Sequence, residues 1–286
     1  MWWWAATVSP TVSEPLIEVA DVSVRFGEFV ALDGVGWTVD GPGVVGLIGL
    51  NGAGKTTLIR TVLGLQRVAA GSVRVPVGLD AVGYCPDTPG FEPWLSAREV
   101  LAQSMAIGAV RPAGEWTIDS ALAAVDLERH AHRRAGGFSR GMLQRLGIAA
   151  ALVRAPGVLI LDEPTSALDP EGRAAVLSLM RELGGRMTVV FSSHLLADVE
   201  DLADRLLVLH RGRAVFAGDT TDFLDRHTGS PTLRITMTDG RIIESEHSEW
   251  APALTDAAAH SGEIDDIRIT RPTLTDAFFA AIGEKP

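Results

Sequence analysis

Cysteine and long apolar runs are both scarce in this chain. Cys85 is the only cysteine among the 286 residues, so neither an internal disulfide nor a cysteine-based metal site can form, which fits a reducing compartment. The longest apolar stretches, residues 43–50 and 147–153, fall far short of the roughly 20 residues that span a bilayer. We therefore expect any link to a membrane to be made through a partner.

Clusters of basic residues are also missing. The formal net charge is −11, and no run rich in Lys or Arg stands out. General nucleic-acid binders carry a basic surface, and proteins that adhere to anionic lipid by themselves carry a polybasic patch. We therefore expect no nucleic-acid partner and no direct adhesion to lipid.

The chain has the composition of an ordinary folded protein. Hydrophobic residues make up 47% of it and charged residues 21%, with no internal repeat and no low-complexity segment. Its length allows one large α/β domain and a small additional one. Residues 1–15 begin Met-Trp-Trp-Trp and lack the basic flank and apolar core of a signal peptide. We expect this segment to form a frayed N-terminal tail, with a mis-chosen start codon as the alternative.

Hydrophobic periodicity predicts strands in the first half of the chain. Residues 16–26 alternate apolar and polar side chains, and residues 30–39 follow after a short connection, which predicts an antiparallel layer. Residues 43–48 are apolar on both faces, as in a central parallel strand, and lead through a Gly-rich turn to a helix at about 54–63. Further strands are expected at residues 72–75, 81–85, 158–162 and 188–192, and a hairpin at 205–217.

Two further regions complete the expected organisation. Ala- and Leu-rich stretches between residues 96 and 154 predict a helical insertion in an α/β core. From residue 222 onward short strands and helices predict a small α+β appendage. Its strands are expected at 232–237, 241–244 and 266–270, and its helices near 251–260 and 273–282. The expected divisions are a tail at 1–15, a main domain at 16–221 with a helical subdomain at about 94–155, and an appendage at 222–286.

Residues 49–57, Gly-Leu-Asn-Gly-Ala-Gly-Lys-Thr-Thr, satisfy the phosphate-binding pattern G-x-x-x-x-G-K-[ST]. Glycines let backbone N–H groups wrap phosphate oxygens, and the helix that follows points its N-terminus at the same charge. Lys55 is expected to reach the β- and γ-phosphates, and the Thr56 hydroxyl to ligate Mg²⁺. A chance match is the alternative, but the strand and helix on either side argue against it. The predicted nucleotide-binding residues here are Asn51, Gly52, Ala53, Gly54, Lys55, Thr56 and Thr57.

A second polar site follows the apolar strand at residues 158–162. The strand ends on Asp162 and Glu163, at the sheet edge where α/β proteins bind ligands. Asp162 is placed to hold Mg²⁺, and Glu163 to polarise the attacking water as a general base. Alone, Asp-Glu-Pro reads equally as a surface turn; with the phosphate loop it predicts a catalytic pair. The two motifs predict an α/β fold with a P-loop NTPase core.

The segment Phe138-Ser139-Arg140-Gly141-Met142-Leu143-Gln144-Arg145 resembles the signature sequence of ATP-binding-cassette (ABC) proteins, and the resemblance covers about residues 16–220. From the residues alone, Ser139 and Gly141 open a helix with an anion-friendly N-terminus. The resemblance implies that Ser139 and Gly141 contact the ATP held by a second copy. Two chains then share two sites in a head-to-tail C2 homodimer in the ATP-bound state.

Further matches to the family follow the chain order. Residues 166–169, Ser-Ala-Leu-Asp, resemble the loop that communicates across the dimer. His194 resembles the switch histidine that contacts the γ-phosphate, although an isolated His after a strand is more often a packed or surface residue. Phe26, before Gly27, resembles the aromatic that stacks on adenine, where the alternative is a core side chain.

Two positions depart from the family pattern. Asp87 follows Pro86 where the family usually has Gln, so its direct contact with Mg²⁺ or the attacking water is in question, and action through a water is the alternative. Arg140 stands where the commonest signature has a second glycine, which resembles the ABC-2-type exporter ATPases; a solvated side chain is favoured over a phosphate contact. Residues 271–279 resemble the tail of the same exporters. The appendage is read as a cap over apolar surface, with dimer contact or regulation as the alternative.

The resemblance implies an ATP-hydrolysing subunit of an exporter, with ATP and Mg²⁺ as cofactors. Its partner would be a separately encoded integral membrane permease, and its location cytoplasmic, on the inner face of the membrane. One alternative is a relative that works on ribosomes or DNA; such proteins usually carry two cassettes, long insertions or zinc-binding cysteines. Another is a non-hydrolysing regulator, which the presence of Lys55, Asp162, Glu163 and His194 disfavours.

Overall fold

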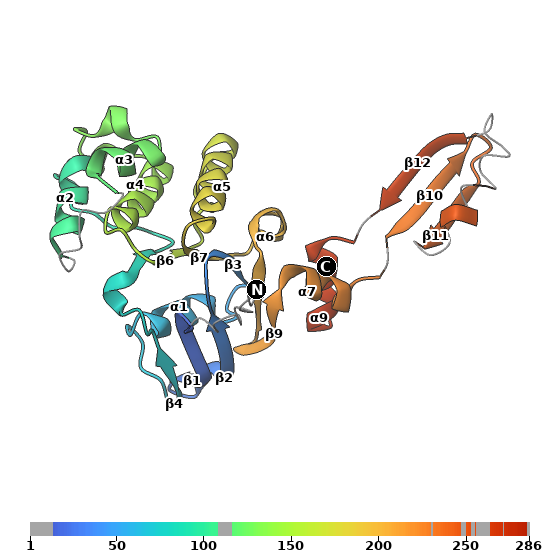
Figure 1. The fold of residues 1–286 in the computed structure, drawn as a ribbon, viewed down its shortest axis with the longest axis horizontal. Helices are drawn as coiled ribbons and strands as arrows, with labels where there is room; N and C mark the ends of the chain where they lie inside the picture. Colours follow the sequence, from blue (N-terminus) through green and yellow to red (C-terminus); the bar gives the residue numbers. More distant parts are fainter. Residues whose placement is uncertain are drawn as a thin grey trace, which may run out of the picture. The chain divides into compact units, whose positions relative to one another are not determined.

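The structure is a computed structural model that describes residues 14–107, 116–229, 231–246, 250–252, 255, 264–270 and 272–284. It divides into two compact units, residues 1–217 and 218–286 (Figure 1). Most of the expected N-terminal tail lies outside the described residues. The second unit begins at residue 218, a few residues before the appendage expected from residue 222. The domain limits expected from the sequence stay predictions.

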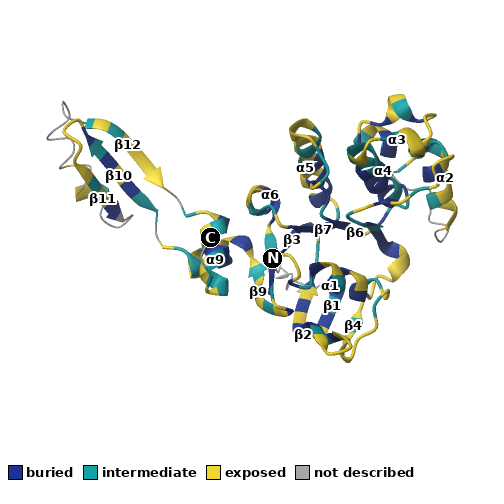
Figure 2. Ribbon diagram, turned by 180° about the vertical axis from the view of Figure 1, so that it is seen from behind, coloured by how far each residue is buried: buried dark blue, intermediate teal, exposed yellow. Residues whose placement is uncertain are grey.

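The first unit is built on a six-stranded sheet in the order β5-β6-β7-β3-β8-β9. Neighbouring strands from β5 to β8 pair in parallel, and this explains their continuous apolar runs, because a parallel sheet is covered on both faces. Figure 2 shows the central strands of this sheet largely in the colour of buried residues. The strands are β3 (Gly43–Ile48), β5 (Val82–Cys85), β6 (Val158–Asp162), β7 (Thr188–Ser193), β8 (Arg205–His210) and β9 (Arg213–Asp219), and the helices between them are α1 (Lys55–Val62), α5 (Pro170–Gly184) and α6 (Leu196–Leu202).

A second, antiparallel sheet has the order β2-β1-β4, with β1 (Ile17–Phe26), β2 (Phe29–Val39) and β4 (Ala70–Arg74). Its inward side chains, among them Val22 and Leu32, share one buried core with Leu58 of α1 and Ile160 of the main sheet. The alternating pattern of these strands therefore reflects one buried and one exposed face. The expected antiparallel layer is present, and the fold class predicted from the sequence is confirmed.

The helical insertion contains α2 (Ala97–Ile107), α3 (Ile118–Ala124) and α4 (Arg140–Leu152), with short 3₁₀ turns before and between them at Leu79–Ala81, Glu128–His130 and Ala135–Gly137. Thr117 closes a capping box with Ser120 at the start of α3, and Ser139 caps α4. These side chains satisfy backbone N–H groups that a helix start leaves unpaired. Helix α4 contacts α2, α3 and strand β5, so it joins the insertion to the main sheet.

The second unit contains a three-stranded antiparallel sheet in the order β11-β10-β12 and two helices that contact each other, α7 and α9. Leu233, Ile235 and Met237 form the buried face of the sheet. The expected helix near 251–260 lies largely outside the described residues. The elements are α7 (Thr220–His227), β10 (Thr232–Met237), β11 (Ile242–Glu246), β12 (Ile264–Thr270) and α9 (Leu274–Ile282).

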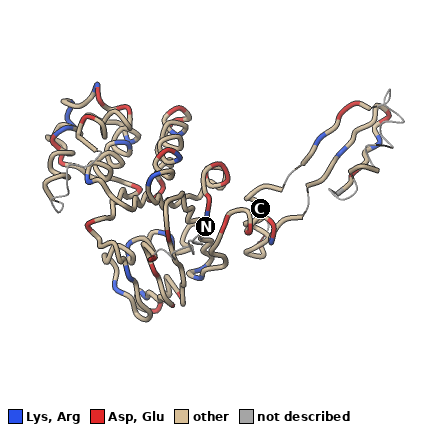
Figure 3. Tube along the Cα trace, in the orientation of Figure 1, with Lys and Arg blue, Asp and Glu red and all other residues tan. Residues whose placement is uncertain are grey.

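Two general properties of the described chain bear on its partners. In the described part, each helix is too short or too polar to cross a bilayer. Figure 3 shows basic residues scattered among acidic ones along the described trace.

Candidate active site

The phosphate loop connects β3 to α1, and two glycines allow its path. Gly52 and Gly54 have φ angles of 79° and 111°, in the region that residues with a Cβ rarely adopt. A Cβ on Gly54 would also lie 2.8 Å from the Ala31 carbonyl oxygen. Helix α1 begins directly afterwards at Lys55. Its free N-terminal N–H groups and dipole therefore face the loop, as an anion site requires.

Lys55 lies between the phosphate loop and the acidic residues. Its Nζ donates a hydrogen bond of 2.7 Å to the Gly49 carbonyl and lies 3.7 Å from Glu163 Oε1. The two side chains are only 8% and 16% exposed. A cation held in such a poorly hydrated place interacts strongly with anions brought to the loop.

The buried carboxylate of Asp162 accepts hydrogen bonds from two hydroxyl groups, one from a helix and one from a strand. Its Oδ2 accepts a 3.0 Å hydrogen bond from Thr56 Oγ1, and its Oδ1 accepts one of 2.5 Å from Ser192 Oγ. Thr56 comes from α1 and Ser192 from β7. One hydroxyl and one carboxylate side by side form the small set of oxygen ligands that Mg²⁺ takes from a protein when phosphates and waters complete its shell. The predicted ligands Thr56 and Asp162 therefore fit this ion.

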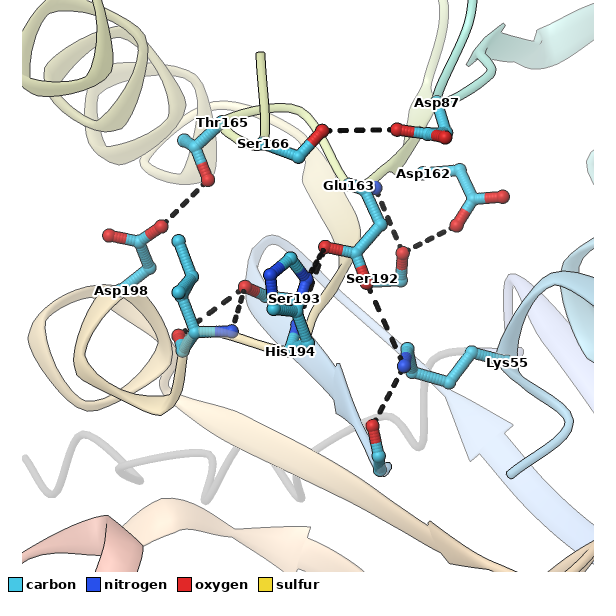
Figure 4. A network of polar contacts seen from close by, with 12 residues as sticks. Lys55, Asp87, Asp162, Glu163, Thr165, Ser166, Ser192, Ser193, His194 and Asp198 are labelled. Atoms are coloured by element: carbon cyan, nitrogen blue, oxygen red, sulfur yellow. Dashed lines mark hydrogen bonds and ion pairs between the residues drawn. The ribbon is translucent and has the colours of Figure 1, made fainter. Parts of the chain in front are cut away.

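Glu163 is fixed by its backbone as well as by its side chain (Figure 4). Its φ angle of 49° is rare for a residue with a side chain, and its N–H donates to Ser192 Oγ at 2.9 Å. Glu163 Oε2 lies 2.7 Å from His194 Nδ1 and accepts a second, 3.3 Å hydrogen bond from the His194 N–H. Strained backbone of this kind is common at functional sites, where surrounding contacts maintain it.

Ser192 was not expected as a functional residue, yet its hydroxyl donates to Asp162 and accepts from the Glu163 N–H. It therefore sets the distance between the acidic pair and β7, the strand that leads to His194. A polar residue that ends an otherwise apolar strand was the only signal in the sequence.

A second unexpected contact involves Asp198, which is 1% exposed. Its Oδ2 accepts a 2.7 Å hydrogen bond from Thr165 Oγ1. Its Oδ1 lies 2.7 Å from Arg173 Nε and 2.6 Å from Arg173 Nη2. One buried carboxylate thus joins the turn after Glu163 to helices α5 and α6. In the sequence, Asp198 looks like any acid of an amphipathic helix.

Residue 87 makes its contact away from the predicted metal ligands. Asp87 Oδ1 accepts a 3.0 Å hydrogen bond from Ser166 Oγ, in the loop before α5. Among the described residues no hydrogen bond joins Asp87 to Thr56 or Asp162. Its assignment as a magnesium ligand stays a prediction.

The signature segment lies at the start of α4, beside the loop at residues 166–169. Ser139 Oγ accepts from the Met142 N–H at 3.2 Å, and a Cβ on Gly141 would lie 3.3 Å from the Ala167 carbonyl oxygen. A hollow of about 300 Å³ opens between the two segments. Among the described residues no hydrogen bond or ion pair joins this hollow to the phosphate loop.

Phe26 stands at the end of β1, before Gly27. Its side chain is 51% exposed, and Gly27 has a φ angle of 60° that lets the chain turn into β2. An exposed ring offers a face for stacking, so the alternative of a core side chain is not what the structure shows. Phe29, its partner in the strand pair, is 62% exposed and was not singled out from the sequence.

These groups lie at one edge of the main sheet, where β3, β6 and β7 end. A glycine loop with a buried lysine, a hydroxyl beside a buried Asp, and a Glu paired with a His are the parts of a nucleotide-hydrolysing site. The fold and the site define a P-loop ATPase.

Comparison with known proteins gives the family. The pattern of the family described as ABC transporter matches residues 32–166. The uncharacterized ABC transporter ATP-binding protein YxlF of Bacillus subtilis is 36% identical, over 91% of this chain and 90% of that protein. The Nod factor export ATP-binding protein I of Burkholderia lata is 33% identical, over 82% of this chain and 81% of that protein. A solved structure of an ATP binding subunit of an ABC transporter is 31% identical with a TM-score of 0.68, covering 74% of this chain and 92% of that one.

The chain belongs to the ATP-binding proteins of the ABC transporter family. It is accordingly an ATP-binding ATPase subunit of a transporter, a class whose members pair with membrane permeases and dimerise. The resemblance to exporter ATPases drawn from the sequence is confirmed, since relatives named for export are among the matches.

Proposed function

We propose that this chain hydrolyses Mg-ATP to ADP and phosphate and thereby powers an ABC-2-type exporter. The observation that carries the proposal is the position of Glu163, whose carboxylate lies 3.7 Å from Lys55 Nζ and 2.7 Å from His194 Nδ1. A general base must reach the proton that it removes and must be held in place. Glu163 is held by its backbone, by His194 and by Lys55.

The chemistry then follows from the residues on each side. Lys55 neutralises charge on the β- and γ-phosphates, and the N–H groups of residues 51–57 wrap their oxygens. Mg²⁺, held by Thr56 and Asp162 with Asp87 as a further proposed ligand, supplies charge neutralisation when bound. Glu163 orients a water and accepts its proton, and His194 contacts the γ-phosphate. Most of the acceleration comes from positioning and charge.

The remaining nucleotide contacts come from Phe26 and from a second copy of the chain. Phe26 supplies a ring for the adenine, and the helix start at Ser139 and Gly141 supplies N–H groups for the partner copy's γ-phosphate. Because the hollow at Ser139 and the phosphate loop are separate features of one chain, a head-to-tail C2 homodimer completes two sites at once. ATP binding closes this dimer, and hydrolysis with product release reopens it.

The transport partner is a separately encoded integral membrane permease, which holds the chain at the inner face of the membrane. An apolar groove beside the helical insertion, of about 400 Å³ and lined in part by Leu65, Pro86 and Ile107, offers the docking surface. The Asp87 loop borders the groove and contacts the 166–169 loop, so it passes motion between the permease and the dimer interface. The direction of transport as export is supported by Arg140 in the signature and by the relatives named for export.

The test is recovery of the tagged Glu163→Gln variant from native membranes in Mg-ATP, followed by identification of the proteins that come with it. We expect a polytopic membrane protein. Recovery of ribosomes, DNA-repair proteins or no partner would leave the ATPase standing and remove the transport proposal. A parallel sample without nucleotide shows whether the association depends on the ATP-bound dimer.

A further inference from the structure

The turn between strands β8 and β9 lies against the phosphate loop. Its Gly212 N–H donates a 3.0 Å hydrogen bond to the Ala53 carbonyl. A Cβ on Gly49 would lie 2.4 Å from the Leu209 carbonyl oxygen, and a Cβ on Gly54 would lie 3.8 Å from Gly212 Cα. The loop and the turn therefore touch through their backbones, and each limits where the other can lie.

Strand β2 holds the turn in place. The Gly212 carbonyl accepts a 2.8 Å hydrogen bond from the Asp33 N–H, and the Asp33 carboxylate accepts from Arg213 Nε and Nη2 at 2.9 and 2.6 Å. Gly212 has a φ angle of 79°, and a Cβ on it would lie 2.8 Å from the Ala31 carbonyl oxygen. A side chain at this position would therefore strain the backbone of the turn and push the turn away from β2.

The carbonyl groups of the phosphate loop are held in two ways. The Gly49 carbonyl accepts from Lys55 Nζ, and the Gly54 carbonyl accepts from the Leu58 N–H of α1, so both are held from within the loop and the helix that follows it. The Ala53 carbonyl differs, because its donor belongs to a distant part of the sequence. The turn thus acts on the loop at a point that the loop and α1 do not fix by themselves.

The planarity of the peptide bond links the Ala53 carbonyl to a donor for phosphate. In a trans peptide the C=O and the N–H of the next residue point in opposite directions. Because the Ala53 carbonyl points at the turn, the Gly54 N–H points away from the turn. The N–H groups of such a loop wrap phosphate oxygens, and a donor whose direction is already fixed needs no reorganisation when the anion arrives.

We propose that Gly212 is a positioning residue for nucleotide binding, which holds the Ala53 carbonyl and thereby directs the Gly54 N–H at the phosphates. The inference rests on the proposed function, since it takes the phosphate loop as the place where ATP binds. The ion pair between Asp33 and Arg213 fastens the turn to β2. These two side chains are 41% and 74% exposed, so the backbone contacts of Gly212 carry most of the effect.

The first test compares wild type with Gly212→Ala and Gly240→Ala. Gly240 lies in the turn between β10 and β11 and has a φ angle of 85°, but a Cβ on it would meet no described atom within 4 Å. It therefore controls for the strain of alanine at a positive φ. We expect the Kd and the KM for ATP to rise roughly tenfold in Gly212→Ala, as for one lost hydrogen bond to a charged group, and to stay unchanged in Gly240→Ala.

The division of the effect between KM and kcat separates positioning from a loss of stability. A variant that only unfolds more readily has a smaller active fraction, which lowers the apparent kcat and leaves KM unchanged. A variant whose loop binds phosphate less well has a higher KM. We expect kcat of Gly212→Ala at saturating ATP to stay within about twofold of wild type, because Glu163 and His194 keep their contacts with each other.

The second test uses the wild-type chain, so it holds even where Gly212→Ala fails to fold. Coupling between two sites is reciprocal, so a turn that strengthens nucleotide binding is itself stabilised by the nucleotide. We expect ATP in the presence of EDTA, which prevents hydrolysis, to slow hydrogen exchange of the Gly212 amide several-fold. The Gly240 amide, which donates to the Met237 carbonyl at 2.9 Å, should exchange at the same rate with and without ATP. Mass spectrometry with fragmentation to single residues would measure both rates.

The outcomes separate this inference from the proposed function. If wild type binds no ATP, the proposed function fails and this inference fails with it. If wild type binds ATP and Gly212→Ala binds it equally well, the proposed function stands and the role of Gly212 is overturned. A lower kcat at unchanged KM, or exchange at Gly212 that does not respond to ATP, would also overturn that role.

Discussion

At the scale of single residues, the site depends on how Glu163 is held. Its left-handed backbone and its contacts with Lys55, Ser192 and His194 place the carboxylate before any substrate arrives. A side chain of the same shape without the charge should keep this arrangement and lose only the ability to accept a proton.

We therefore expect Glu163→Gln to lower kcat by about 100-fold or more, the range of a lost general base, with the Kd for ATP within a few-fold of wild type. Single-turnover hydrolysis and calorimetric ATP titration would measure the two quantities. Glu171→Gln, an exposed acid in the first turn of α5, is the matched control. Turnover at the wild-type rate in Glu163→Gln would remove the base assignment.

Lys55 should act on binding itself. Its side chain is 8% exposed and its Nζ is already placed beside the loop, so Lys55→Ala removes a charge-assisted hydrogen bond to phosphate, a contact of about 1.5–3 kcal/mol. We expect ATP affinity to fall roughly tenfold or more in the same calorimetric titration. Unchanged affinity would contradict the role given to Lys55.

Cys85 gives a prediction about pH. Burial, followed by the negative charges of Asp162 and Asp87, raises the pKa of the Cys85 thiol. A group whose pKa is raised by folding stabilises the fold fully below the ordinary thiol pKa of about 8.5 and loses that contribution as the pH rises above it. Alkylation by iodoacetamide requires an accessible thiolate. Because the Cys85 thiol is buried and its pKa is raised, native protein at pH 8 should resist iodoacetamide, while denatured protein reacts at once. Rapid native alkylation, followed by mass spectrometry, would show that the thiol is accessible.

At the scale of helices and strands, Asp198 joins α6 to α5 and to the turn after Glu163. Asp198→Asn leaves Arg173 without its anion. Breaking such a pair costs about 3–5 kcal/mol when it is fully buried, and roughly 2 kcal/mol is expected here because Arg173 is 35% exposed. Thermal unfolding should then move down by about 5 °C for a unit of this size.

A matched control and a double variant make this prediction specific. Asp201→Asn changes an exposed acid on the same helix and should leave unfolding unchanged. Replacing Asp198 and Arg173 together by Leu removes both charges, so most of the lost stability should return. If Asp198→Asn and the double variant were equally unstable, the pair would not be the cause.

Local patterns were sufficient to predict the main elements of the fold. The apolar runs at residues 43–48 and 158–162 predicted β3 and β6 at the observed bounds, because a short continuous apolar run is typical of a strand buried on both faces. The phosphate loop was equally readable, since its glycines and its lysine have fixed spacing. Contacts between distant strands were not readable: nothing local tells that Ser192 touches Asp162, or that Asp198 meets Thr165 and Arg173.

At the scale of the whole molecule, the proposed ATP-bound homodimer gives a prediction. Among the described residues no hydrogen bond or ion pair joins the helix start at Ser139 to the phosphate loop, and the proposed function gives each of them to an ATP shared with a second copy. We expect Glu163→Gln with Mg-ATP to elute as a dimer in light-scattering chromatography and without nucleotide as a monomer. Adding Ser139→Phe, which fills the hollow beside α4, should prevent the dimer while leaving ATP binding intact. A dimer that persists without nucleotide would contradict ATP-driven closure.

Strand β7 lies between β6 and β3 in the sheet, and this position has a consequence for amide hydrogen exchange. All six of its residues are buried, so its amides should exchange only through global unfolding. The segments that carry Leu65 and Ile107, two exposed residues of the apolar groove, should instead exchange through small local fluctuations. Ser192, which holds Asp162 and the Glu163 N–H, thus stands on a strand that we expect to exchange slowly, and the proposed docking surface on segments that we expect to exchange faster. Mild warming should therefore loosen the response to the permease before it touches the capacity for hydrolysis.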